Sequence, residues 1–95
     1  MADPKFDSTN VTGGKRYTNI SASTLIKTGE GDIIGIWVAS TTAGTVKLWD
    51  NTSAATTVLL NTSTLNTGWN PMPFHFNTGL YITVANTLDC TVSWS

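Results

Sequence analysis

The sequence contains one cysteine, one histidine and few charged residues, and each shortage excludes a class of protein. A lone Cys90 cannot close a disulfide within the chain, so the fold must depend on its hydrophobic core, and nothing argues for an oxidising compartment. Charged residues make up 12% of the chain, and the formal net charge is -1. The chain therefore has no basic stripe for phosphate backbones, which argues against nucleic acid as a partner.

Long apolar runs are also missing. The longest, residues 33–39, is interrupted by Gly35 and is far shorter than the ~20 residues that a membrane-spanning helix needs. The chain begins with Met-Ala-Asp-Pro and shows no apolar signal-peptide region. We therefore expect no membrane partner, and a protein made in the cytoplasm of its host cell. Its 95 residues predict one small domain, because a second core would need roughly 50 residues of its own.

Small polar residues dominate what is present. The chain has 18 threonines, 8 serines and 8 asparagines, whereas glutamine is absent and the other strong helix formers are sparse. Threonine packs well on a pleated surface, so this composition predicts β-strands whose solvent face is rich in hydroxyl groups. With so few charges to oppose self-association, an oligomer or a permanent place in an assembly is more plausible than a free monomer.

Alternating apolar residues, bounded by Gly, Ser or Asn, predict eight short strands after an N-terminal arm. The arm covers residues 1–14, where no amphipathic period can be drawn, and a β-domain follows over residues 15–95. The predicted strands are residues 17–20, 24–28, 32–40, 45–50, 56–61, 72–76, 80–85 and 88–94. Short strands at close spacing with no helix indicate an all-β fold, a small antiparallel β-sandwich or jelly-roll.

Turn residues separate these strands. Residues 41–44 predict the turn of an antiparallel hairpin, and Asn86-Thr87 predicts another tight connection. Residues 62–73 contain asparagine, glycine and proline, so they predict the longest connection after the arm, with the form of a Greek-key crossover.

Two tryptophans are the candidate contact residues of the domain. Strand alternation places Ile34, Ile36, Val38, Val46 and Leu48 in the core, and it places Ile33 on the outer face with Trp37. If residues 32–40 and 45–50 pair as a hairpin, Trp37 and Trp49 share an outer face, with Tyr81 from another strand beside them. The alternative is that the tryptophans only cover a rim of the core.

No residue cluster predicts a reaction, a cofactor or a metal. The sole histidine, His75, is expected to point outward from its strand, and no Cys/His spacing suits zinc. The Gly-rich residues 28–31 lack the phosphate-binding fingerprints and are better explained as a hairpin turn. Four tryptophans and two tyrosines are candidates for a sugar-stacking platform, with Asp50, Asn51 and Asn70 as polar partners.

Two stretches carry a resemblance. Residues 28–54, which include Gly-Ile-Trp-Val-Ala-Ser and Val-Lys-Leu-Trp-Asp-Asn, resemble the central hairpin of small β-sandwich virion proteins of tailed bacteriophages. Residues 76–94, with Gly-Leu-Tyr-Ile-Thr-Val-Ala, are similar to the last two strands of the same proteins. The resemblance covers most of residues 21–95, leaves the arm unmatched and involves no catalytic signature.

The resemblance implies a non-enzymatic capsid decoration, or cement, protein. Such a protein sits on the outer shell, binds the major capsid protein, often as a homotrimer, and adds stability. The candidate partner-binding residues are Phe6 and Val11 in the arm and Trp37, Trp49 and Tyr81 in the domain. Because small sandwiches also occur in phage tails and fibres, a carbohydrate- or receptor-binding module is the alternative function.

Overall fold

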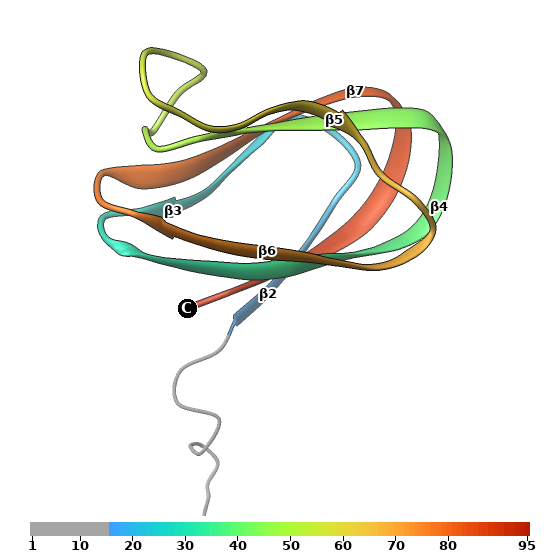
Figure 1. The fold of residues 1–95 in the computed structure, drawn as a ribbon, viewed down its shortest axis with the longest axis horizontal. Coiled ribbons are helices and arrows are strands. Elements are labelled where there is room, and N and C mark those ends of the chain that lie inside the picture. The colour runs from blue at the N-terminus through green and yellow to red at the C-terminus, as the bar shows by residue number, and fades with distance from the viewer. Residues whose placement is uncertain (1–15) are drawn as a thin grey trace, which may run out of the picture.

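A computed structural model describes residues 16–95, which form an all-β, antiparallel domain without a helix (Figure 1). Phe6 and Val11 lie outside the described residues. The strands are β2 (Arg16–Ile20), β3 (Thr24–Thr28), β4 (Gly31–Trp49), β5 (Val58–Thr64), β6 (Gly68–Phe76) and β7 (Gly79–Trp94). Since this part of the chain contains no helix, it has none that is long and apolar enough to cross a membrane.

The two long strands, β4 and β7, organise the sheet. They pair antiparallel from Ile33 with Trp94 to Trp49 with Tyr81. Each takes different neighbours at its two ends: β4 pairs with β6 near its start and with β5 near its end. In the same way, β7 pairs with β3 near its start and with β2 near its end. Short strands therefore flank both halves of a long central pair.

A sharp bend in β4 and β7 replaces the predicted turns. Residues 41–44 do not close a hairpin, because residues 31–49 form one strand, and Asn86-Thr87 lies inside β7. The pairing register shifts between Thr42 and Thr45, and Ala43 and Asn86 have φ of 52° and 63°. The Asn86 side chain donates to the Ala43 carbonyl at 2.8 Å, which joins the two bends. Residues with turn chemistry thus bend two strands without reversing either one.

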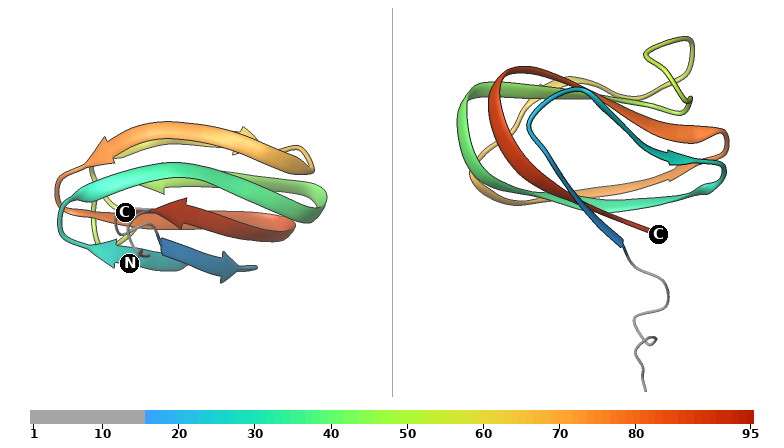
Figure 2. Two further views of the ribbon diagram at one scale, coloured as in Figure 1. Left: turned by 90° about the horizontal axis from the view of Figure 1, so that it is seen from below. Right: turned by 180° about the vertical axis from the view of Figure 1, so that it is seen from behind.

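The bend folds the sheet over on itself without closing it into a barrel (Figure 1). Figure 2 shows one side from below, with β6, β4, β7 and β2 lying next to one another in the order of their pairing. The other side carries β5, β4, β7 and β3. The prediction of eight strands is wrong for the described residues, because two pairs of predicted strands are each continuous through the bend.

The core lies between the two sides of the folded sheet. Ile36 and Val38 before the bend pack in one cluster with Val46 and Leu48 after it, and Phe76, Leu80, Ile82, Cys90 and Val92 complete its fully buried part. Ile33 is 2% exposed, whereas Ile34 is only partly buried, so their predicted orientations are reversed. The cause is a register irregularity between Ile33 and Gly35, which shifts the alternation by one residue.

The connection from β5 to β6 is shorter than predicted. β5 ends at Thr64 and β6 begins at Gly68, so residues 65–67 alone carry the chain from one side of the sheet to the other. Leu65 is buried there, and its N–H donates to the Gly44 carbonyl at 3.3 Å. Pro71 and Pro73 are tolerated within β6 because this strand pairs with β4 alone and lies at an edge.

Candidate binding surfaces

Trp37 and Trp49 do not share a face. Both belong to β4, but they lie on opposite sides of the bend: Trp37 pairs with Trp69 and Thr91, whereas Trp49 pairs with Val58 and Tyr81. The predicted common face is wrong because it required a hairpin between residues 32–40 and 45–50. The two outer faces of the folded sheet each receive one of the two tryptophans instead.

The first outer face carries four apolar side chains in register across four strands. Leu25 pairs with Tyr81, Tyr81 with Trp49, and Trp49 with Val58. We call these four residues the apolar row. Leu25 and Val58 are each 41% exposed, and Tyr81 and Trp49 between them are partly buried.

Contacts along β4 and β7 hold Trp49 within this row. Its Nε1 donates to the Thr83 hydroxyl at 2.9 Å, and the Lys47 ammonium lies 4.4 Å from the centre of a Trp49 ring. A cation at this distance is attracted by the face of the indole. The indole is therefore fixed against the sheet, and one of its faces is covered by a charged side chain.

The other outer face contains a hollow of about 510 Å³ lined mainly by aromatic rings. We call it the aromatic hollow, and its lining residues are Tyr17, Ile34, Trp37, Trp69, Thr91 and Ser93. Trp37 and Trp69 are direct cross-strand partners on β4 and β6, with 54% and 49% of their surface exposed.

The position of Trp69 depends on Gly35. A Cβ atom built on Gly35 would lie 2.3 Å from the Trp69 ring, so the indole occupies space that any other residue would fill. The next residue, Asn70, fixes the backbone around Trp69, because its side-chain amide donates to the carbonyls of Asn66 and Gly68. The sequence did not predict Trp69 as a partner of Trp37, because the asparagine, glycine and proline in residues 62–73 predicted a connection there and not a strand. A glycine within an apolar strand was the available signal of a close approach.

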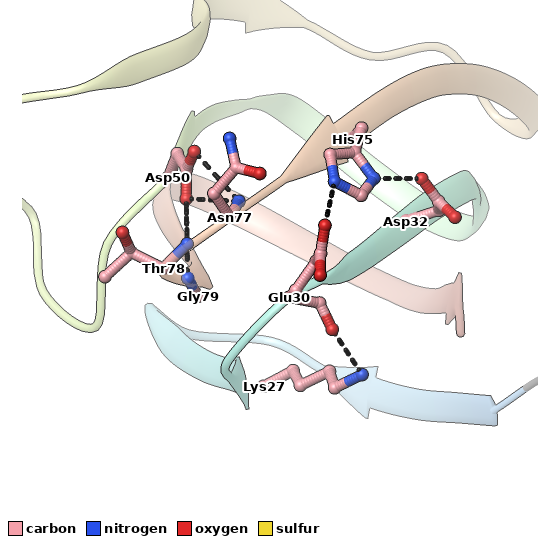
Figure 3. Close-up of polar contacts among 8 residues, drawn as sticks. All are labelled: Lys27, Glu30, Asp32, Asp50, His75, Asn77, Thr78 and Gly79. Carbon is pink, nitrogen blue, oxygen red and sulfur yellow. Dashed lines mark hydrogen bonds and ion pairs between the residues drawn. The ribbon is translucent and has the colours of Figure 1, made fainter.

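A histidine between two carboxylates lies near the end of β6, where this strand pairs with the start of β4 (Figure 3). His75 pairs across the strands with Asp32, and its Nδ1 lies 2.7 Å from Asp32 Oδ1. Its Nε2 lies 2.9 Å from Glu30 Oε2. The hydrogen bonds to Asp32 and then to Glu30 raise the pKa of His75 above its ordinary value of 6.5. The protonated ring donates to both carboxylates at once, which links the end of β6 to the start of β4. We call His75, Asp32 and Glu30 the His75 clasp.

The polar residues proposed above as sugar partners have turn-forming roles. Asp50 accepts hydrogen bonds from the backbone N–H groups of residues 77–79, the shortest being 2.8 Å from Thr78 (Figure 3). Burial alone would raise the pKa of Asp50, but these N–H donors outweigh it and lower the pKa below its ordinary value of 3.8. Asn51 donates to the Ala55 carbonyl, and Asn70 holds the turn before β6. None of the three lines the aromatic hollow as described.

Cys90 belongs to the core. Burial, with a smaller contribution from Asp89, raises the pKa of its thiol to about 11, so the reactive thiolate scarcely forms near neutral pH. Within residues 16–95, no three His, Cys, Asp or Glu side chains are grouped so that they could hold a metal ion. His75 illustrates this, because its two nitrogens face separate carboxylates.

Searches among protein-family models, curated proteins and solved structures found no match to this chain. The features of the described residues that bear on function are therefore the two outer faces, with the apolar row on one and the aromatic hollow on the other.

Proposed function

We propose that this chain is a non-enzymatic virion structural protein of a tailed bacteriophage, a capsid decoration protein that binds and stabilises the outer shell. In this proposal the domain is a two-layered jelly-roll sandwich on the capsid surface. Its partner is the major capsid protein, and it binds as a homo-oligomer, with a trimer favoured.

The apolar row is the observation that carries the proposal. Leu25, Tyr81, Trp49 and Val58 form a continuous apolar strip across four paired strands. A row fixed by sheet hydrogen bonds offers a rigid contact surface, so little conformational entropy is lost when a partner covers it. Aromatic residues at the centre with less bulky apolar residues around them are typical of the part of an interface that contributes most to affinity.

The scarcity of charge supports a place in an assembly. Among residues 16–95, the exposed positions are mainly threonine, serine and asparagine, and only 12% of all residues in the chain are charged. Such a surface provides weak electrostatic repulsion between copies or against a shell of like charge. It suits a protein held permanently at an interface better than one that must stay apart from its neighbours.

Stabilisation would follow from mass action. A protein that binds the assembled shell, but not its separated subunits, lowers the free energy of the shell by its binding free energy. In the proposal, residues 1–14 add to this by reaching a neighbouring subunit, with Phe6 and Val11 as apolar anchors.

The test is the thermal stability of the shell. Purified shells of the phage that encodes this chain are heated with and without saturating protein, and their dissociation is followed by light scattering. The proposal expects dissociation at a higher temperature when the protein is present, and an increment that saturates with protein concentration. An unchanged dissociation temperature, together with no protein bound to the shells, would overturn it.

A further inference from the structure

We propose that the aromatic hollow is a binding site for a neutral carbohydrate, with pyranose rings stacked on Trp37 and Trp69. The site lies on the outer face opposite the apolar row, and the inference goes beyond shell binding. Binding at this site would not need a capsid, because all the residues that form it belong to the described part of a single chain.

The pair of tryptophans provides the stacking surface. Trp37 and Trp69 lie directly opposite each other on β4 and β6, and about half of each residue is exposed. One face of a pyranose ring presents C–H groups, which pack favourably against the electron-rich face of an aromatic ring. Two adjacent indoles therefore suit an oligosaccharide better than a single sugar.

The platform is held in place before any ligand arrives. The Trp69 indole rests where a side chain on Gly35 would be, and the Asn70 amide fixes the backbone next to it. A ring already held in its binding position loses little rotational freedom when a ligand stacks on it. This arrangement explains why a glycine stands inside the first half of β4, where a β-branched residue would otherwise favour the strand.

The hydrogen-bonding groups around the rings favour a neutral, hydroxyl-rich ligand. The described lining carries no charged side chain, and its polar side-chain groups are the hydroxyls of Tyr17, Thr91 and Ser93 and the indole N–H groups of the two tryptophans. Of these, Tyr17 is 71% exposed, and Ser93 is nearly buried in the wall. Hydroxyl groups both donate and accept hydrogen bonds, which matches the hydroxyls of a sugar. A charged ligand would find no counter-charge in this lining.

The volume of the aromatic hollow, and its difference from the surroundings of Trp49, also support a carbohydrate site. A volume of about 510 Å³ lies within the ~300–1,000 Å³ range of small-molecule sites. Trp49, on the opposite face, has Lys47 over its ring and does not line the aromatic hollow. An indole already covered by an ammonium group offers less surface to a sugar, which makes Trp49 a matched control.

The experiment is a printed array of neutral oligosaccharides probed with the full chain, followed by titration of any bound glycan with tryptophan fluorescence as the readout. We expect wild-type protein to bind at least one class of neutral glycan. Trp37→Ala and Trp69→Ala should each weaken binding at least tenfold, whereas Trp49→Ala should change it less than twofold. Circular dichroism and thermal melting establish that each variant is folded.

Two further variants keep the test valid if a tryptophan variant fails to fold. Tyr17→Ala alters a highly exposed ring, and Gly35→Ala displaces Trp69 without removing it. Both should weaken glycan binding. Absence of glycan binding by folded wild-type protein would overturn the proposal, as would binding that survives loss of Trp37 or falls equally with Trp49→Ala. If hollow variants reduce shell binding and no glycan binds, the hollow is a protein contact and the carbohydrate proposal is wrong.

Discussion

The indole of Trp69 lies over the bare Cα of Gly35, at a position where a Cβ atom would be 2.3 Å from the ring. The two residues are brought together by the pairing of β4 with β6, which sets Gly35 opposite Pro71 and Trp37 opposite Trp69. Because Gly35 has no side chain, the Trp69 ring can pack directly against the backbone of β4. Both the shape of the aromatic hollow and the orientation of its central residue depend on it.

Gly35→Ala should displace the Trp69 ring and destabilise the fold by about 1 kcal/mol, the lower end of the ~1–3 kcal/mol typical of overpacking. The cost is limited because the ring is half exposed and has room to move, although the Asn70 carbonyl, 2.9 Å from the same Cβ position, is backbone. Urea unfolding measures the loss. In a Trp69→Ala background the same substitution should cost clearly less, and equal costs in both backgrounds would contradict the contact.

Two adjacent residues in the bend of β4 should respond in opposite ways. Ala43 has a φ of 52°, so Ala43→Gly relieves a strained backbone and should stabilise the protein by up to about 1 kcal/mol. A Cβ on Gly44 would lie 2.7 Å from the Thr87 carbonyl and 2.8 Å from Leu88 Cβ. Gly44→Ala should therefore destabilise by about 1–3 kcal/mol. Thermal melting of the two variants checks both signs, and a stable Gly44→Ala would argue against the bend.

The His75 clasp should make stability depend on pH near neutrality. Because the folded-state pKa of His75 is raised above 6.5, its contribution is fully present below that value and is lost as pH rises through the folded pKa. In low salt, the free energy of unfolding should be slightly smaller at about pH 8.5 than at about pH 5.5, and His75→Gln should abolish this difference. Since His75 is the only histidine, its pKa is also readable directly by NMR. Asp32→Asn should lower that pKa, and an unchanged value would contradict the clasp.

Removing the exposed ends of the apolar row should weaken shell binding without unfolding the domain. Leu25→Ser with Val58→Ser alters two residues that are 41% exposed, so we expect a stability loss of about 1 kcal/mol or less. Shell affinity should fall about tenfold or more, which corresponds to about 1.4 kcal/mol. Tyr17→Ser on the opposite face serves as the control and should bind shells normally. A double variant that binds normally, or one that loses its oligomeric mass instead, contradicts a docking role for the row.

Deleting residues 1–14 should leave the fold intact. All members of the described core cluster lie between Ile20 and Trp94, and we expect this cluster to persist when the arm is deleted. Circular dichroism and melting temperature should change little, whereas shell binding should weaken through loss of Phe6 and Val11. Unfolding of the truncated chain would show that the first residues belong to the domain and are not an arm.

The sequence predicts the type of secondary structure and much of the core better than it predicts how the strands are connected. Alternation correctly places Ile36, Val38, Val46 and Leu48 in the core, and the β composition predicts an antiparallel sheet without helices. It does not reveal whether residues 41–44 reverse the chain or bend it, because both use residues that accept positive φ and small side chains. Pairing between β4 and β7, which are far apart in the sequence, decides the outcome.

The candidate surfaces were predicted only in part for the same reason. Tyr81 lies beside Trp49 as expected, because both neighbouring strands follow the regular alternation. Trp37 joins Trp69 and Tyr17 instead, since the hairpin that would have brought it to Trp49 does not form. Ile34 reaches the hollow through a local irregularity that shifts the alternation by one residue, and the adjacent Gly35 is its only mark in the neighbouring sequence.

The most direct test of shell binding is a sedimentation titration of the full chain against purified shells, with its solution mass first determined by light scattering. We expect a compact oligomer that sediments with the shells and saturates at a number of copies related to the shell symmetry. A monomer that stays in the supernatant at every shell concentration would contradict it.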